Sequence, residues 1–156
     1  MKKLLRTGFY QNTVGKMSGQ MRTGLIASVM LYLISLVLPA FESIGVKNYK
    51  EQLWGAVVLA VGWAGGFGGI YAWYANLFWL FGLAMAYWRI RVAVVVSGAI
   101  AVALAASALT LVGQALPCFQ PCILTRFLPG YYVWIASLIT LPVAALLPQN
   151  TKPSAA

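Results

Sequence analysis

Three long stretches without a charged side chain limit the fold of this chain more than any other feature of its sequence. No Asp, Glu, Lys or Arg occurs in residues 52–88, 92–125 or 127–151. Charged residues make up 8% of the 156 residues, whereas a typical soluble domain has about 25%. Uncharged apolar stretches of about 20 residues are typical of membrane-spanning helices. The sequence therefore predicts an all-α integral membrane protein with a single domain, residues 1–156.

Four membrane-spanning helices are predicted, and together they would form a four-transmembrane-helix bundle. They cover residues 24–41, 70–88, 92–114 and 128–147. Pro39 and Glu42 mark the end of the first helix. Pro129 falls in the first turn of the last helix, where proline is tolerated. Pro142 lies inside that helix and predicts a kink, which neighbouring helices in a membrane bundle can accommodate.

The apolar run from Trp54 to Trp88 is too long for one span. Its 35 residues would extend about 52 Å as a helix, against about 30 Å for the hydrocarbon core of a bilayer. Glycines weaken helices, so we expect a break at Gly65, Gly66, Gly68 and Gly69. Residues 54–64 would then form an extra short helix, interfacial or re-entrant. Two complete spans within this run are the alternative.

Basic residues are divided unequally between the two sides of such a bundle. One side holds eight of them, namely Lys2, Lys3, Arg6, Lys16, Arg22, Arg89, Arg91 and Lys152. The other side holds three, namely Lys47, Lys50 and Arg126. The positive-inside rule then places both termini in the cytoplasm. Segments 1–23, 89–91 and 148–156 would be cytoplasmic, and segments 42–53 and 115–127 extracytoplasmic. The first apolar run lacks a small-residue cleavage site, so we expect it to be retained as an anchor.

Both cysteines of the chain lie in one predicted extracytoplasmic loop, in the sequence PCFQPC. We expect Cys118 and Cys122 to form a disulfide there, because that side of a bacterial membrane is oxidising and the flanking prolines favour a turn. Two free thiols and a redox pair are the alternatives. Thiol oxidases need a CxxC motif and a second cysteine pair, whereas this chain has a single CxxxC. No further ligand accompanies the cysteines, so we expect neither a metal nor a cofactor.

The longest polar loop holds the only two acidic residues of the chain, Glu42 and Glu51, with Lys47 and Lys50 between them. This loop could face a partner outside the cytoplasm, or it could be a solvated connector. Two carboxylates on a loop of this kind are weak evidence for acid–base catalysis. The pattern therefore predicts no catalytic site.

Polar side chains are few within the predicted spans, and none of them is charged. Their neutrality argues against a proton-coupled pump. We expect Asn76 to hydrogen-bond a neighbouring helix rather than a ligand. Small residues recur every four positions at Ala93, Ser97, Ala101 and Ala105 and again at Ala136, Thr140 and Ala144. This spacing favours close helix packing inside the bundle, with a partner-binding face as the alternative.

The segment LPGYYVWIASL (128–138), after AWYANLFWL (72–80) and a basic hairpin, resembles a loose group of small uncharacterised bacterial membrane proteins. Members of that group have a last helix that begins with a PGYY-x-W-x-AS-like sequence. The resemblance implies a multi-pass protein of the bacterial inner membrane and assigns no activity. The PCFQPC loop is outside the shared pattern.

These features together predict a non-enzymatic protein that acts by binding another membrane component. An immunity-type protein against a membrane-acting toxin and an accessory subunit of a membrane complex both fit. A small passive channel or transporter and a thiol-redox protein using Cys118 and Cys122 are the alternatives. The lipid bilayer and another membrane protein are the expected partners, self-association into a homo-oligomer stays open, and no nucleic acid is expected because the +9 charge serves membrane orientation.

Overall fold

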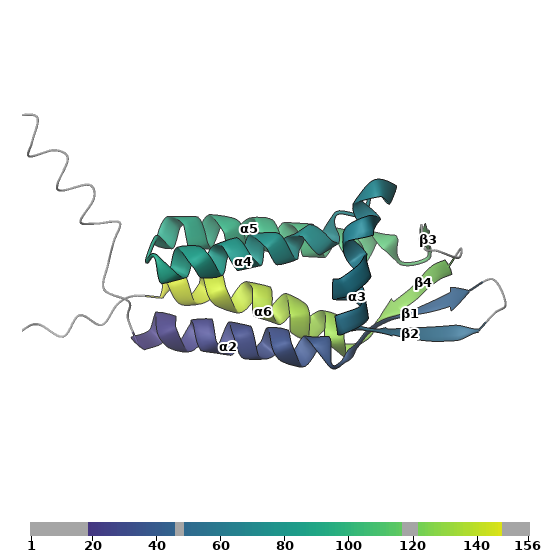
Figure 1. Cartoon of the computed structure of the whole chain (residues 1–156), viewed down its shortest axis with the longest axis horizontal. Helices are drawn as coiled ribbons and strands as arrows, with labels where there is room; N and C mark the ends of the chain where they lie inside the picture. Colours follow the sequence, from purple (N-terminus) through teal and green to yellow (C-terminus); the bar gives the residue numbers. More distant parts are fainter. Residues whose placement is uncertain (1–18, 46–48, 117–121, 148–156) are drawn as a thin grey trace, which may run out of the picture.

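The computed structural model describes residues 19–45, 49–116 and 122–147, and it consists of long helices capped at one end by a small sheet (Figure 1). The four main helices lie side by side. They are α2 (Gly19–Leu36), α4 (Ala75–Tyr87), α5 (Arg91–Ser107) and α6 (Pro129–Leu146). α6 packs against both α2 and α5, and α5 packs against α4.

Three of the described helices are long and apolar enough to cross a membrane. They are α2, α6 and the continuous stretch Arg91–Leu111, in which the 3-10 helix η3 (Ala108–Leu111) extends α5. The predicted second span is shorter than expected, because Ala72–Tyr74 form the separate 3-10 turn η2 and α4 itself has 13 residues. Four spanning helices are therefore not confirmed. The first helix also ends earlier than predicted, at Leu36, because Pro39 starts a strand.

The helices have apolar outer surfaces and place polar side chains inside. Ser28, Ser35, Ser97 and Ser137 are all buried. Large apolar side chains stay about half exposed on the outside of each helix, among them Ile26, Leu33, Leu80, Val96 and Val143. The interior thus combines small polar side chains with an apolar cluster, and the outer surface is largely apolar. This distribution suits a lipid surrounding, where small and polar residues make many interhelical contacts.

Small residues let the helices approach closely at two crossings. Gly24 of α2 lies against Ala144 of α6, and Gly98 of α5 lies against the ring of Pro142. The Pro142 ring inside α6 is thus accommodated by a neighbour without a side chain. The predicted ladder on α5 packs inside the bundle at Ser97, Ala101 and Ala105, whereas Ala136 of the second ladder is exposed.

A four-stranded antiparallel sheet covers one end of the bundle, so the prediction of a mainly helical chain is confirmed but the fold is not purely all-α. Its strands are β1 (Pro39–Gly45), β2 (Lys50–Trp54), β3 (Ala115–Leu116) and β4 (Cys122–Phe127), in the order β2-β1-β4-β3. β1 and β4 pair directly, with Phe41 opposite Phe127 and Gly45 opposite Cys122. The two predicted extracytoplasmic loops are therefore joined in one sheet. This pairing satisfies backbone groups that two separate loops would leave to solvent.

The short helix predicted before the glycine cluster is α3 (Gly55–Val61), which continues as the 3-10 helix η1 (Gly62–Gly68). Gly69 follows with a φ of +79°, a conformation that favours glycine. The Ile70 N–H donates back to the Gly65 carbonyl at 2.9 Å and closes the turn. α3 and α4 are therefore separate helices on either side of this turn.

The start of α2, the end of α6 and the turn between α4 and α5 all lie at the end of the bundle opposite the sheet (Figure 1). That turn is tight, since α5 begins at Arg91 and Arg89 has a φ of +64°. The basic residues Arg22, Arg89 and Arg91 are thus gathered at one end of the bundle. Lys50 and Arg126 lie at the other end, in the sheet.

Candidate binding site

A cavity of about 480 Å³ lies where the helices meet the sheet. It is partly open and is lined by the C-terminal end of α2, the N-terminal ends of α4 and α6, η2, η3, strands β1, β2 and β4, and the α3–η1 segment. Apolar and aromatic side chains form most of its wall, among them Leu36, Val58, Leu124, Phe127 and Trp134. Ligand cavities are typically of this size and composition.

No charged side chain is among the described residues that line the cavity. Its polar side chains are two tyrosines, two tryptophans, one serine and one asparagine, namely Tyr32, Tyr131, Trp73, Trp134, Ser35 and Asn76. A charged ligand would lose its hydration there without gaining a counter-ion, which is strongly unfavourable. The cavity is therefore suited to a neutral molecule.

Asn76, at the start of α4, is the polar centre of this wall. Its Oδ1 accepts a hydrogen bond from the Tyr32 hydroxyl at 3.0 Å and another from Trp134 Nε1 at 2.9 Å. Its Nδ2 donates to the Trp73 carbonyl at 2.8 Å. Asn76 thus connects α2, α4 and α6 at one point, and the expectation that it bonds neighbouring helices is confirmed.

These partners also fix the orientation of the Asn76 amide. An indole N–H can only donate and a backbone carbonyl can only accept. The atom facing Trp134 must therefore be the oxygen, and the atom facing the Trp73 carbonyl must be the nitrogen. The whole residue is 6% exposed, so the amide is held in this orientation away from bulk water.

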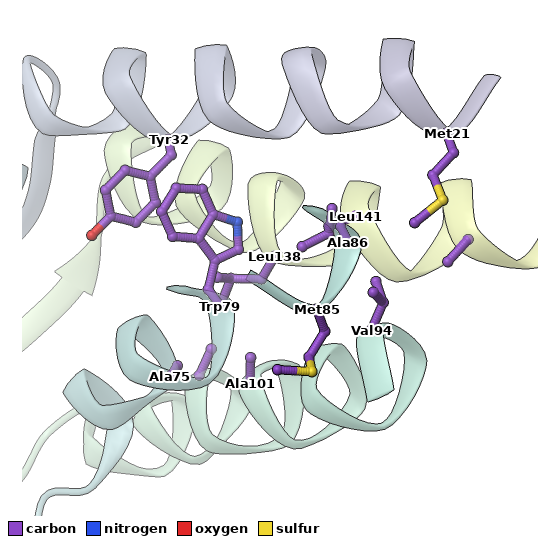
Figure 2. Packing of buried hydrophobic residues seen from close by; sticks show 12 residues of the cluster. Met21, Tyr32, Ala75, Trp79, Met85, Ala86, Val94, Ala101, Leu138 and Leu141 are labelled. Atoms are coloured by element: carbon purple, nitrogen blue, oxygen red, sulfur yellow. The ribbon is translucent and has the colours of Figure 1, made fainter. Parts of the chain in front are cut away.

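A second set of hydrogen bonds lies inside the bundle. Trp79 Nε1 donates to Ser28 Oγ at 2.9 Å, and Ser28 Oγ donates to the Ser137 carbonyl at 2.7 Å. The rings of Tyr32 and Trp79 are stacked face to face (Figure 2). This stack connects the polar wall of the cavity with the second set, which ties the same three helices together.

The α3–η1 segment is held over the cavity by close backbone contacts. Trp73 Nε1 donates to the Leu59 carbonyl at 2.8 Å, and Gly62 lies directly against the Trp73 indole. Gly55, at the start of α3, lies against the Ser35 carbonyl of α2. Each of these glycines stands where a Cβ atom would collide, so the sequence of α3 is adapted to lie close to the bundle. Trp73 thereby holds α3 and η1 against the bundle.

The Glu42 side chain is buried in a cluster of ion pairs, and the partner-facing role of its loop stays a prediction. Its side chain is 6% exposed and pairs with Arg126 Nη2 at 2.8 Å and with Lys50 Nζ at 3.6 Å. The hydrogen bond from Arg126 is the main cause that holds the pKa of the Glu42 carboxyl below its usual value, while desolvation opposes the shift. Glu42 and Arg126 stand opposite each other in β1 and β4, so the ion pair joins two strands.

The other residues of that loop have different positions. Lys50 and Glu51 are exposed in β2, and Lys47 lies outside the described residues.

The remaining predicted site residues are the glycine cluster and the cysteines. Gly65 of the glycine cluster is one of the residues that line the cavity. Cys122 is the first residue of β4, and its expected partner Cys118 lies outside the described residues, so the disulfide stays a prediction. Within the described ranges, no three His, Cys, Asp or Glu side chains come together.

The cavity residues were largely missed by sequence reasoning. Asn76 was noticed as the only amide in the predicted second span, but Tyr32 and Trp134 carried no signal beyond their apolar surroundings. Their hydrogen bonds to Asn76 form only because α2, α4 and α6 meet at one point, and a local sequence pattern does not predict such a meeting. Comparisons of the chain with protein-family models, with curated proteins and with solved structures found no match.

Proposed function

We propose that this chain is a multi-pass protein of the bacterial inner membrane that binds a neutral, mainly apolar small molecule in the cavity between the bundle and the sheet. The small molecule is proposed in addition to the membrane-protein partner expected from the sequence, and both termini are proposed to be cytoplasmic. The observation that carries the proposal is the cavity of about 480 Å³ without a charged wall residue. It stands at the end of a bundle whose outer surface is apolar, where molecules dissolved in the membrane are concentrated.

Binding is favoured over catalysis by the state of the polar groups in the cavity. Tyr32 and Tyr131 donate their hydroxyl hydrogens to Asn76 Oδ1 and to the Ala105 carbonyl, at 3.0 Å and 2.8 Å. A general acid or base needs a titratable group within reach of the substrate and poised near the working pH. Hydroxyls engaged in this way serve the architecture of the wall. We therefore propose a non-enzymatic role.

We further propose that α4 is the fourth span of the bundle. With η2 it forms 16 continuous residues from Ala72 to Tyr87, or about 25 Å along its axis. That is slightly shorter than the hydrocarbon core, and such a mismatch costs fractions of a kcal/mol per Å. Its outer side chains Leu77, Leu80 and Phe81 are about half exposed and apolar, as a lipid-facing helix requires.

An immunity-type role, a place in a membrane complex and a homo-oligomer stay predictions from the sequence, as do the channel and thiol-redox alternatives. A small-molecule cavity is compatible with the first two, since a bound molecule can stabilise a protein that also contacts a partner.

The proposal is tested by filling the cavity from α3. Val58 lines it, whereas the neighbouring Val57 is 47% exposed and is not a wall residue. The variants Val58→Trp and Val57→Trp therefore make the same change at a wall position and at an exposed position of the same helix. Binding of 2-acetylnaphthalene to purified protein in detergent micelles, measured by calorimetry against empty micelles, is expected to be lost in Val58→Trp and kept in Val57→Trp. Equal binding by both variants, or none by the unaltered protein, would contradict the proposal.

A further inference from the structure

The polar groups of the cavity leave one hydrogen-bond donor unused. Ser35 Oγ donates to the Tyr32 carbonyl at 2.6 Å, and Trp73 Nε1 donates to the Leu59 carbonyl. The hydroxyls of Tyr32 and Tyr131 and the indole N–H of Trp134 are also engaged. Every side-chain donor on the described wall thus has an acceptor, except for the second N–H of Asn76.

Asn76 Nδ2 carries two hydrogens, and one of them is directed to the Trp73 carbonyl at 2.8 Å. No other acceptor for this nitrogen occurs among the described residues. Asn76 is 6% exposed, so bulk water reaches it poorly. A buried donor without an acceptor is unfavourable, and structures rarely leave one in that state. Because Asn76 lines the cavity, a molecule bound there can accept the hydrogen bond from the second N–H.

The geometry points to a ligand class for the cavity: we infer that it takes a neutral, mainly apolar molecule with one acceptor oxygen, such as a carbonyl, which accepts a hydrogen bond from Asn76 Nδ2. This inference rests on the proposed function and specifies its ligand. The lack of a cationic side chain on the described wall disfavours carboxylates and phosphates. The apolar surroundings disfavour molecules with many polar groups.

Two molecules of nearly equal shape separate this inference from simple apolar binding. 2-Acetylnaphthalene has a carbonyl oxygen, and 2-ethylnaphthalene has none. We expect the ketone to bind about 3- to 10-fold more tightly, as one net hydrogen bond predicts. If both naphthalenes bind equally and Val58→Trp removes both, the cavity binds apolar molecules and the assigned hydrogen bond is wrong. If neither binds, the proposed function itself fails.

The variant Asn76→Asp removes the unused donor with little change in shape. The aspartate oxygens can accept from Tyr32 and Trp134, and in its protonated form the single O–H is needed at the Trp73 carbonyl. We expect Asn76→Asp to bind ketone and hydrocarbon equally. The control Val57→Trp, at an exposed position outside the cavity wall, leaves Asn76 Nδ2 in place and should keep the preference for the ketone. A preference that persists in Asn76→Asp would overturn the inference. If Asn76→Asp does not fold, the two probes are compared on the unaltered protein and on Val57→Trp, and equal binding of both probes there would overturn the inference.

Two sources of such a carbonyl exist in membranes, namely acyl esters of lipids and free ketones. Methyl octanoate, with a single ester carbonyl, represents the first source and 2-acetylnaphthalene the second. Displacement of 2-acetylnaphthalene by methyl octanoate, or saturable binding of the ketone alone with the expected preference over the hydrocarbon, would each support the ligand class. Failure of both to bind in preference to 2-ethylnaphthalene would contradict it.

Discussion

Tyr32 of α2 and Trp79 of α4 are stacked with their ring centroids 4.1 Å apart and their planes within 10° (Figure 2). Both side chains are buried, at 8% and 5% exposure. The stack joins two helices that each pack on α6 or α5 rather than extensively on one another. Each ring also has a polar contact, since Tyr32 donates to Asn76 and Trp79 donates to Ser28. The stack therefore supports the wall of the cavity from inside the bundle.

Shortening Trp79 tests this support. We expect Trp79→Phe to lower the free energy of unfolding by about 1 kcal/mol, because one buried hydrogen bond is lost while a ring remains. Trp79→Ala should lower it by about 2–4 kcal/mol, because the stack and its packing are lost as well. Denaturant unfolding in detergent micelles measures both. The control Leu80→Ala, on a half-exposed neighbour, should change little, and a Trp79→Ala effect no larger than this control would disprove the role of the stack.

The crossing of α5 and α6 depends on Gly98. A Cβ atom at this position would lie 2.6–2.9 Å from the ring carbons of Pro142. Because a proline ring in a helix cannot move aside easily, Gly98→Val should lower the free energy of unfolding by about 1–3 kcal/mol. The matched variant Ala99→Val adds a similar volume at an exposed position of the same helix. Equal thermal midpoints for the two variants would show that the close approach at Gly98 is not required.

Acid should weaken the sheet through Glu42. Its pKa is held below the ordinary value of 4.5, chiefly by the hydrogen bond from Arg126. A carboxyl whose pKa is lowered by folding contributes stability above its unfolded pKa and loses it as the pH falls through the folded pKa. Hydrogen exchange of the β1 and β4 amides should therefore accelerate as the pH falls below about 4.5, after correction for intrinsic exchange rates. Glu42→Gln should remove this acid effect, and Glu51→Gln should leave it in place.

The disulfide between Cys118 and Cys122 remains a testable prediction. In protein purified without reductant, we expect neither thiol to be alkylated until a reductant is added, as mass spectrometry would detect. The ring is small, so its contribution should be at the low end of the roughly 2–4 kcal/mol that disulfides give. The double variant Cys118→Ser, Cys122→Ser should still fold and bind 2-acetylnaphthalene. Ready alkylation without reductant would refute the disulfide. A fully folded double variant without biological activity would favour thiol chemistry.

Much of the helical architecture follows from local sequence rules. The apolar runs predict α2, α5 with η3, and α6 because a helix in lipid must satisfy its backbone within itself, so its signal is contained in about 20 consecutive residues. The glycine cluster marks the turn between α3 and α4 for an equally local reason, since Gly69 adopts a positive φ. The helix ends were less accurate. Pro39 is the first residue of a strand rather than part of a helix.

The sheet and the cavity required the tertiary structure. Glu42 and Arg126 are 84 residues apart in the sequence, and neither strand has a strong signal alone, because a strand is stabilised by the partner against which it pairs. The loop 42–53 therefore looked like a polar connector. In the structure, the carboxylate of Glu42 is buried and paired with Arg126 of β4.

The sequence by itself determined that this chain forms helices long and apolar enough to cross a membrane, and that a glycine turn separates α3 from α4. These properties depend on consecutive residues and on the solvent around them. Only the tertiary structure decided that Tyr32, Asn76 and Trp134 meet at one point and that a neutral cavity lies beside them. Hydrogen bonds between helices depend on which faces are brought together, and that is settled by packing over the whole chain rather than by any segment of it.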